Sequence, residues 1–451
     1  MPRRPRSART LREVVVVGLV GVLGAVLARL GGRAIDLEVY RTAGEVWRAG
    51  LPLYQDGYPH GLGVYLPFTY PPFAALVLGL TSLLPSPVAL AVVSAASLVA
   101  LAGSSYLAGH RARLTRPWAQ VPLTVTAALA ALAVALEPVR LSLFFGQVNL
   151  VLMAMVTADL LVRRPRWPRG LLIGIAAAVK LTPLAFLLVL LCRRQWKACA
   201  TAVVTFGAAQ LTGAVLLPAD SRDYWFGGVL TAPGRIGSAD TATNQSLRGV
   251  LARAWPDAPS LVWLGLVAVT GVLTVVATRR RTTRDDDLGA LLATAAGGLL
   301  VSPVSWTHHW VWVVPALVWL AGRARAQTGP ESLASASGGA GDLRDEDATG
   351  VRRGARTWLA WWPAAGVAVV FVVAPAHLLP SGDGREQQWV WWQQLVGGAY
   401  VWLGLAGLVA AALSAPRGSS RRRHRATDTT PTSTEASTQA VVDSPGTVIP
   451  R

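Results

Sequence analysis

The dominant pattern in the chain is a series of long apolar runs separated by short polar segments. A membrane-spanning helix needs about 20 largely apolar residues. Ten runs come near that length: 13–31, 87–109, 118–136, 148–163, 198–218, 259–278, 288–304, 309–322, 357–376 and 394–414. Two shorter stretches, 170–179 and 183–192, predict a helical hairpin with Lys180 near its turn. The pattern predicts an all-α polytopic membrane protein with about twelve transmembrane helices.

The segment 72–84 is apolar but short, and prolines flank it on both sides. If the N-terminus is cytoplasmic and 72–84 does not cross, 31 of the 42 Lys and Arg residues fall on the cytoplasmic side. Cytoplasmic loops of membrane proteins carry such an excess, and a crossing by 72–84 would invert the later loops against this rule. We therefore expect 72–84 to lie at the outer face as a juxtamembrane helix. Both termini are expected to be cytoplasmic, in a multi-pass protein of the inner (plasma) membrane.

The pattern divides the chain into five segments. They are a cytoplasmic N-terminus (1–12), a main membrane module (13–322) with a first outer loop (32–86), a flexible cytoplasmic loop (323–356), C-terminal transmembrane helices (357–414) and a disordered cytoplasmic tail (415–451). The loop is rich in Gly, Ser and Ala, and the tail in Arg and then Ser, Thr and Pro, which is typical of segments that bury little apolar surface.

Composition excludes other classes of protein. Hydrophobic residues make up 52% of the chain and charged residues only 15%, against about 25% charged in soluble domains. The net charge of +18 would suggest a nucleic-acid partner. Its basic clusters alternate with apolar runs, however, and the expected partner is the lipid bilayer, with no nucleic acid. Two cysteines exclude a disulfide framework or a zinc signature.

Asp36 directly follows the first predicted helix, in the sequence Asp36-Leu37-Glu38-Val39-Tyr40. Ionisable groups at an apolar boundary are costly and often functional. A partly desolvated aspartate has a raised pKa and can serve as a general base. Asp36 can equally act as the N-cap of the amphipathic stretch that follows it. The spacing leaves both interpretations open.

Further polar motifs gather in the predicted outer segments. Tyr65 and Tyr70 precede a helix that starts with two prolines, where aromatic walls and a helix N-terminus can hold a phosphate or a sugar, or simply anchor the chain at the interface. Gln147 and Asn149 can bind sugar hydroxyls or cap a helix. Arg140, a basic residue on the outer side, can pair with a phosphate or with Glu137.

Lys180 lies within an apolar hairpin and needs an anionic partner, either a lipid phosphate or a buried acid such as Asp36. His308 and His309 follow Trp306 where two apolar helices are interrupted at the outer face. Adjacent histidines point in different directions on a helix, and no further His or Cys cluster completes a metal site. One of the pair can donate a hydrogen bond to a phosphate or sugar.

Together these motifs resemble the GT-C polyprenol-phosphate-mannose-dependent α-1,2-mannosyltransferases of actinobacteria, glycosyltransferase family 87. The pieces that carry the resemblance are spread over residues 30–310: Asp36 to Tyr40, Tyr70 to Phe73, Gly146 to Asn149, Lys180 to Pro183, Asn244 to Ser246 and Ser305 to Trp310. The resemblance implies a GT-C glycosyltransferase fold, with 13–322 as the catalytic module and the active site on the outer face.

The resemblance also implies a reaction. Asp36 deprotonates the 2-hydroxyl of a mannosylated lipid acceptor, such as a phosphatidylinositol mannoside, which attacks the anomeric carbon of polyprenyl-phosphate-mannose with inversion. The implied donor-binding residues are Tyr70, Arg140, Lys180, His308 and His309. The implied acceptor- or sugar-binding residues are Glu38, Tyr40, Tyr65, Gln147, Asn149, Asn244, Gln245 and Trp306. No second aspartate stands at Asp-X-Asp spacing, in keeping with a metal-independent enzyme that has no cofactor.

Three alternatives remain. An enzyme of the same class can instead branch the mannan of lipomannan and lipoarabinomannan. A transporter of lipid-linked sugars would show internal repeats and midplane charges, whereas here no repeat is found and the polar motifs gather at one face. A scaffolding subunit would not need Asp36, Lys180 and the histidine pair in such apolar surroundings.

Overall fold

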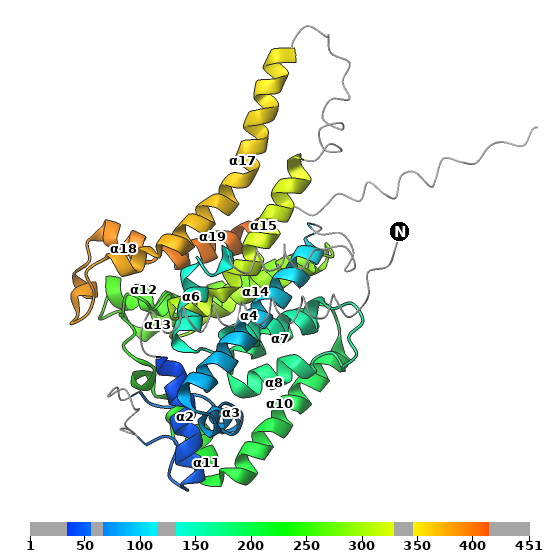
Figure 1. The fold of residues 1–451 in the computed structure, drawn as a ribbon. Coiled ribbons are helices and arrows are strands. Elements are labelled where there is room, and N and C mark those ends of the chain that lie inside the picture. Colours follow the sequence, from blue (N-terminus) through cyan, green and yellow to red (C-terminus); the bar gives the residue numbers. More distant parts are fainter. Residues whose placement is uncertain (1–33, 56–65, 113, 115–131, 329–345, 415–451) are drawn as a thin grey trace, which may run out of the picture. The chain divides into compact units, whose positions relative to one another are not determined.

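The described residues of the computed structural model are 34–55, 66–112, 114, 132–328 and 346–414, with side chains omitted for 346–358 (Figure 1). Throughout these ranges the chain forms helices and loops without any strand, apart from one isolated bridge between Asn244 and Trp306. All of them belong to one compact unit that ends at Ser414. The predicted all-α architecture is confirmed for this part of the chain. The predicted spans 13–31 and most of 118–136, and the tail 415–451, lie outside it.

Three helices are long and apolar enough to cross a membrane: α4 (Ser86–Arg111), α10 (Trp196–Leu216) and α13 (Ser260–Thr282). Two bent pairs raise the number among the described residues to five. They are α6 (Glu137–Phe145) with α7 (Asn149–Leu161), bent by 117°, and α18 (Trp391–Gly397) with α19 (Ala399–Leu413), bent by 69°. The membrane character is thereby confirmed, and the count of twelve spans stays a prediction.

The first outer loop supplies α2 (Ile35–Arg48), an amphipathic helix that buries Leu37, Val39 and Tyr40. The apolar segment predicted at 72–84 is α3 (Pro72–Leu78) continued by the 3₁₀ helix η1 (Gly79–Leu83). Helix α2 packs on both. A Cβ at Gly44 would lie 2.3 Å from the carbonyl oxygen of Gly79, so only glycine permits this approach. The close contact fixes α2, and with it Asp36, against the bundle.

The predicted break at Lys180 is confirmed. Helix α8 (Leu171–Val179) ends there, Lys180 is extended, and the chain resumes as η2 (Thr182–Phe186) and α9 (Leu187–Cys192). Pro183 occupies the first turn of η2, where a proline costs no hydrogen bond. The break leaves the Lys180 side chain free to turn away from both helix axes.

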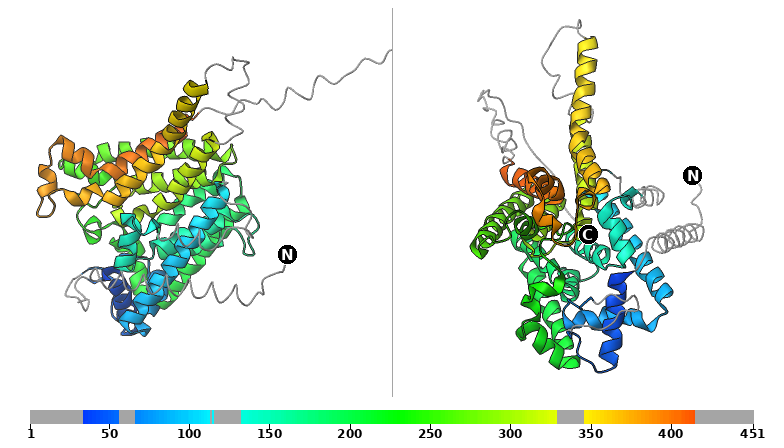
Figure 2. Two further views of the ribbon diagram at one scale, coloured as in Figure 1. Left: turned by 45° about the horizontal axis from the view of Figure 1, so that its top comes forward. Right: turned by 90° about the vertical axis from the view of Figure 1, so that its left-hand side faces the viewer.

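Helix bounds differ from the prediction around the expected cytoplasmic loop 323–356. Helix α15 (Val313–Thr328) continues into it from one side and α17 (Glu346–Val373) from the other, and the two helices pack together (Figure 2). Alanine, arginine and glutamine are strong helix formers and extend α15 past its apolar part, beyond the predicted span 309–322. The other elements are α11 (Pro218–Phe226), η3 (Val229–Thr231), η4 (Pro233–Ile236), α12 (Leu247–Ala254), α14 (Asp287–Val301), η5 (Thr307–Trp312), η6 (Pro375–Leu378) and η7 (Arg385–Gln388).

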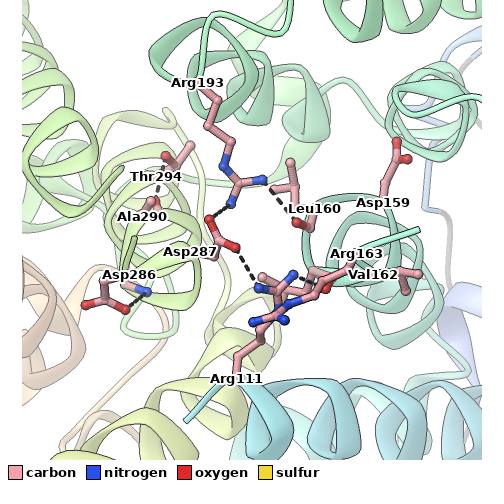
Figure 3. Close-up of polar contacts among 12 residues, drawn as sticks. Arg111, Asp159, Leu160, Val162, Arg163, Arg193, Asp286, Asp287, Ala290 and Thr294 are labelled. Carbon is pink, nitrogen blue, oxygen red and sulfur yellow. Dashed lines mark hydrogen bonds and ion pairs between the residues drawn. The ribbon is translucent and has the colours of Figure 1, made fainter. Parts of the chain in front are cut away.

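Basic residues of the predicted cytoplasmic segments also hold the bundle together. Asp287, at the start of α14, lies between two guanidinium groups (Figure 3): Arg111 at 2.8 Å and Arg193 at 2.7 Å. The same arginines donate to the carbonyls of Leu161 and Leu160, at the end of α7. One carboxylate thus joins α4, α9 and α14, and the arginines satisfy carbonyls that the end of a helix leaves unpaired.

Candidate active site

A cavity of about 510 Å³ opens beside the start of α2, within the usual size range of small-molecule sites. Its walls come from segments far apart in the sequence, namely several of the predicted outer segments and the hairpin turn at Lys180. Among the lining residues are Asp36, Tyr70, Gln147, Lys180, Arg235, Trp306, His308, His309 and His377. The tertiary structure therefore gathers many of the predicted site residues around one space.

Asp36 lies in the first turn of α2, and the N-cap position belongs to Ala34, whose side chain makes no capping hydrogen bond. The capping interpretation of Asp36 is wrong. Its half-buried side chain faces the cavity. Burial raises the pKa of the carboxyl from 3.8 to about 7, although the charge of Lys180 and a hydrogen bond with Gln147 act in the opposite direction. A carboxyl with this pKa is suited to accept a proton near neutral pH.

Lys180 reaches into the same space. Its Nζ donates to Asn149 Oδ1 over 3.1 Å, lies 3.2 Å from His309 Nε2 and sits 5.5 Å above the ring of Tyr70. An ammonium group has no acceptor, so Nε2 of His309 must accept this hydrogen bond and carries no proton. Both hydrogen-bonding partners are neutral, and within the described part of the chain the negative charge that acts on Lys180 is that of the nearby Asp36.

Two tyrosine hydroxyls orient Gln147. The Tyr40 hydroxyl donates to Gln147 Oε1 over 3.0 Å, and the Tyr70 hydroxyl lies 3.1 Å from that of Tyr40 and 3.4 Å from Gln147 Oε1. Tyr40 is almost fully buried and does not reach the cavity, so it positions Gln147 and does not contact a ligand. Tyr70 is also buried and lines the cavity, and is not an exposed interface anchor.

The bend between α6 and α7 places Gln147 and Asn149 next to α2. Gly146 at this bend has φ +68°, and a Cβ there would lie 2.7 Å from the Cβ of Leu37. Glycine meets both requirements. Asn149 faces a smaller cavity of about 60 Å³ on the far side of Lys180, and its Nδ2 donates to the carbonyl of His308 over 3.0 Å. Asn149 therefore fixes Lys180 and the histidine segment and is not in the larger cavity.

The histidine pair and Trp306 line the cavity, and Asn244 and Gln245 hold their segment from behind. Asn244 Oδ1 accepts from the backbone of Ser305 over 3.0 Å, and the carbonyl of Gln245 accepts from Trp310 Nε1 over 3.2 Å. Both side chains are fully buried. They support the segment that carries the histidines and do not contact the cavity.

Two predicted residues lie elsewhere. Glu38 accepts a hydrogen bond from Ser86 Oγ at 2.7 Å and pairs with Arg41, so it joins α2 to the start of α4. Arg140 is exposed and donates to the carbonyl of Ala135. Glu137, one of the two partners expected for Arg140, instead contacts His377 and Tyr400. Tyr65 lies outside the described residues.

Two basic residues of the lining were not singled out from the sequence, Arg235 in η4 and His377 in η6. Both are cationic residue types in predicted outer segments, where positive charge is rare. This signal drew attention to Arg140 and would equally have pointed to Arg235 and His377. Among the described residues, no three His, Cys, Asp or Glu side chains cluster as metal ligands do.

One cavity of this helical bundle brings together a half-buried carboxyl and a lysine, groups that can accept a proton and stabilise an anion. The chain belongs to glycosyltransferase family 87, whose sequence model matches residues 68–304. It is thus a glycosyltransferase, and its family is the one that the sequence motifs indicated.

Among curated relatives, the chain is 36% identical over 399 residues to a protein of Mycobacterium tuberculosis (strain H37Rv), named polyprenol-phosphate-mannose-dependent alpha-(1-2)-phosphatidylinositol mannoside mannosyltransferase. The match covers 84% of each chain. A protein of the same name from Mycolicibacterium smegmatis is 37% identical, over 84% of this chain and 83% of the relative.

A third relative, from Mycobacterium tuberculosis strain CDC 1551, is named for a pentamannoside acceptor and is 36% identical over 68% of this chain and 71% of its own length. Among solved structures, ArnT from Cupriavidus metallidurans bound to undecaprenyl phosphate covers 90% of this chain and 78% of its own, at 17% identity and a TM-score of 0.39.

Proposed function

We propose that this chain transfers mannose from polyprenyl-phosphate-mannose to a lipid-anchored mannoside, forming an α-1,2 linkage with inversion, in phosphatidylinositol mannoside synthesis. The names of the curated relatives support the donor, the linkage and the acceptor class. The observation in the chain itself that carries the proposal is the placement of Asp36 and Lys180 in one cavity.

In this reaction the Asp36 carboxylate takes the proton of the acceptor's 2-hydroxyl. The oxygen attacks the anomeric carbon of the donor sugar, the bond from that carbon to the phosphate oxygen breaks, and the lipid phosphate leaves with the electron pair. Lys180 is close enough to Asp36 to lower its pKa, so a phosphate between them would receive support from the ammonium. Such preorganised charge is commonly the largest catalytic contribution. We propose that no metal takes part, and that a chelator leaves the rate unchanged.

We further propose that the chain adopts a GT-C fold of about twelve spans. In this topology α2, α3 and the cavity lie at the outer face of the plasma membrane, and both termini are cytoplasmic. The positive-inside distribution of arginines supports this orientation. A cysteine introduced at the exposed Arg222 of α11, with Cys192 and Cys199 replaced, should react with a membrane-impermeant thiol reagent on intact cells. Labelling only after lysis would invert the proposed topology.

The base is tested by the variant Asp36→Asn, which keeps the shape and removes the proton acceptor. Loss of a general base costs about 10²- to 10⁴-fold in rate. The assay supplies synthetic polyprenyl-phosphate-mannose with a panel of lipid mannosides and determines the linkage of the product. The matched control is Asp223→Asn, at an exposed carboxylate of α11. Turnover of Asp36→Asn within a few-fold of the control would refute the assignment, and a product that is not α-1,2-linked would refute the function.

A further inference from the structure

Glu137, at the start of α6, is a carboxylate that the mechanism above does not use. It is almost fully buried. Its Oε1 lies 2.7 Å from His377 Nε2, and its Oε2 accepts a hydrogen bond from the Tyr400 hydroxyl over 3.1 Å. A buried carboxylate is stable only when its oxygens are paired in this way. The three groups come from α6, η6 and α19, and the contact with Glu137 holds His377 in place.

The backbone around His377 is also constrained. Ala374, just before η6, adopts φ +50°, a left-handed conformation that is unfavourable for a residue with a side chain. Pro375 then fixes the first turn of η6. The His377 side chain retains 37% of its exposure, and it lines the large cavity. One edge of the ring is thus held by Glu137 while the rest stays accessible.

His377 and Asp36 lie toward opposite ends of one wall of the cavity. Leu141 and Phe145 of α6 line it, and together with Glu137 they are spaced four residues apart, on one helix face. At about 1.5 Å per residue, this face extends about 12 Å from Glu137 to Phe145. Gln147, which hydrogen-bonds Asp36, follows directly after that end. A ligand that reaches both Asp36 and His377 must therefore extend along α6, as an oligosaccharide does and a phosphate does not.

The chemistry of the ring indicates what it binds. When the ring is neutral and its Nε2 hydrogen is donated to Glu137, the other nitrogen, Nδ1, carries a lone pair and accepts hydrogen bonds. A sugar hydroxyl is the donor that such a nitrogen fits.

We propose that His377 is a specificity-determining residue that accepts a hydrogen bond from a sugar unit of the acceptor other than the one that reacts at Asp36. Glu137 is its positioning residue. This inference rests on the proposed function and adds to it a preference for acceptors with several sugars over a single mannose.

The test measures kcat/KM of the full-length protein for two acceptors, octyl α-mannoside and a phosphatidylinositol tetramannoside. His377→Gln keeps a group that can bond Glu137 and removes Nδ1. His377→Asn places an amide oxygen near the position of Nδ1. We expect His377→Gln to lower kcat/KM for the tetramannoside about tenfold, the effect of one lost hydrogen bond, and to leave the value for octyl mannoside unchanged. His377→Asn should recover part of the loss.

The matched control is Tyr400→Phe. It removes the hydrogen bond that Tyr400 donates to Glu137, and Tyr400 does not line the cavity. This variant should keep the wild-type ratio of the two kcat/KM values. Equal losses on both acceptors, or no loss on the tetramannoside, would overturn the role of His377. A change of the ratio in Tyr400→Phe as large as in His377→Gln would overturn it as well. Failure of the wild type to transfer mannose to either acceptor would instead reject the proposed function itself.

Discussion

Transfer is expected to lose activity below pH 7, because the Asp36 carboxyl must be ionised to accept a proton. Its pKa is raised to about 7, chiefly by burial. At pH 6 about one tenth of such a carboxyl is ionised, so kcat/KM should fall about tenfold below its value at pH 8. A solvent-exposed aspartate would give no change over this range, since its pKa is about 3.9.

Lys180→Met should move this acid limb to higher pH. The ammonium charge lowers the pKa of Asp36, and a methionine of similar length removes the charge and leaves the burial. The maximal rate should fall too, because the phosphate loses its cation. Lys197→Met is the matched control, since Lys197 is the only other lysine and is exposed at the start of α10. It should keep the wild-type profile.

The assay follows initial rates of mannose transfer at substrate concentrations below KM, from pH 5 to pH 9, so that the profile reports the free enzyme. A flat wild-type profile would refute the raised pKa of Asp36. A limb at the same pH in Lys180→Met and in the wild type would refute the electrostatic link between the two residues.

Three further outcomes test the structure. Asp36→Asn should raise the thermal midpoint in detergent at pH 8 but not at pH 4, because it removes the cost of ionising a buried carboxyl. That cost is absent below pH 3.8 and grows to no more than about 4 kcal/mol above pH 7. Equal midpoints for mutant and wild type at pH 8 would contradict this expectation. Asp287→Ala should destabilise the protein by about 3 kcal/mol, because it leaves two arginines unpaired; an unchanged midpoint would show that the ion pairs contribute little. Gly44→Ala should reduce both midpoint and transfer, since the methyl group meets the carbonyl of Gly79 and displaces α2; wild-type activity would mean that this contact does not position the base.

Several features could be predicted because they depend on local sequence. The apolar runs gave the positions of α4, α10 and α13, and the prolines gave the separate helix at 72–84. The cost of a polar group in apolar surroundings singled out Asp36 and Lys180. The same argument did not separate residues that face the cavity from residues that support it. Asn244 and Gln245 are as polar as Gln147, yet they bond only to backbone groups of neighbouring segments.

The sequence by itself therefore determined the helical membrane class, the break at Lys180 and the family. The tertiary structure alone decided which polar residues share one cavity. Tyr40 meets Gln147 across 107 positions, and His377 meets Glu137 across 240. Such pairings depend on how the helices pack and bend, as at the 117° turn after α6. Hydrophobic periodicity reports whether a residue faces an apolar environment, and not which distant residue it faces there.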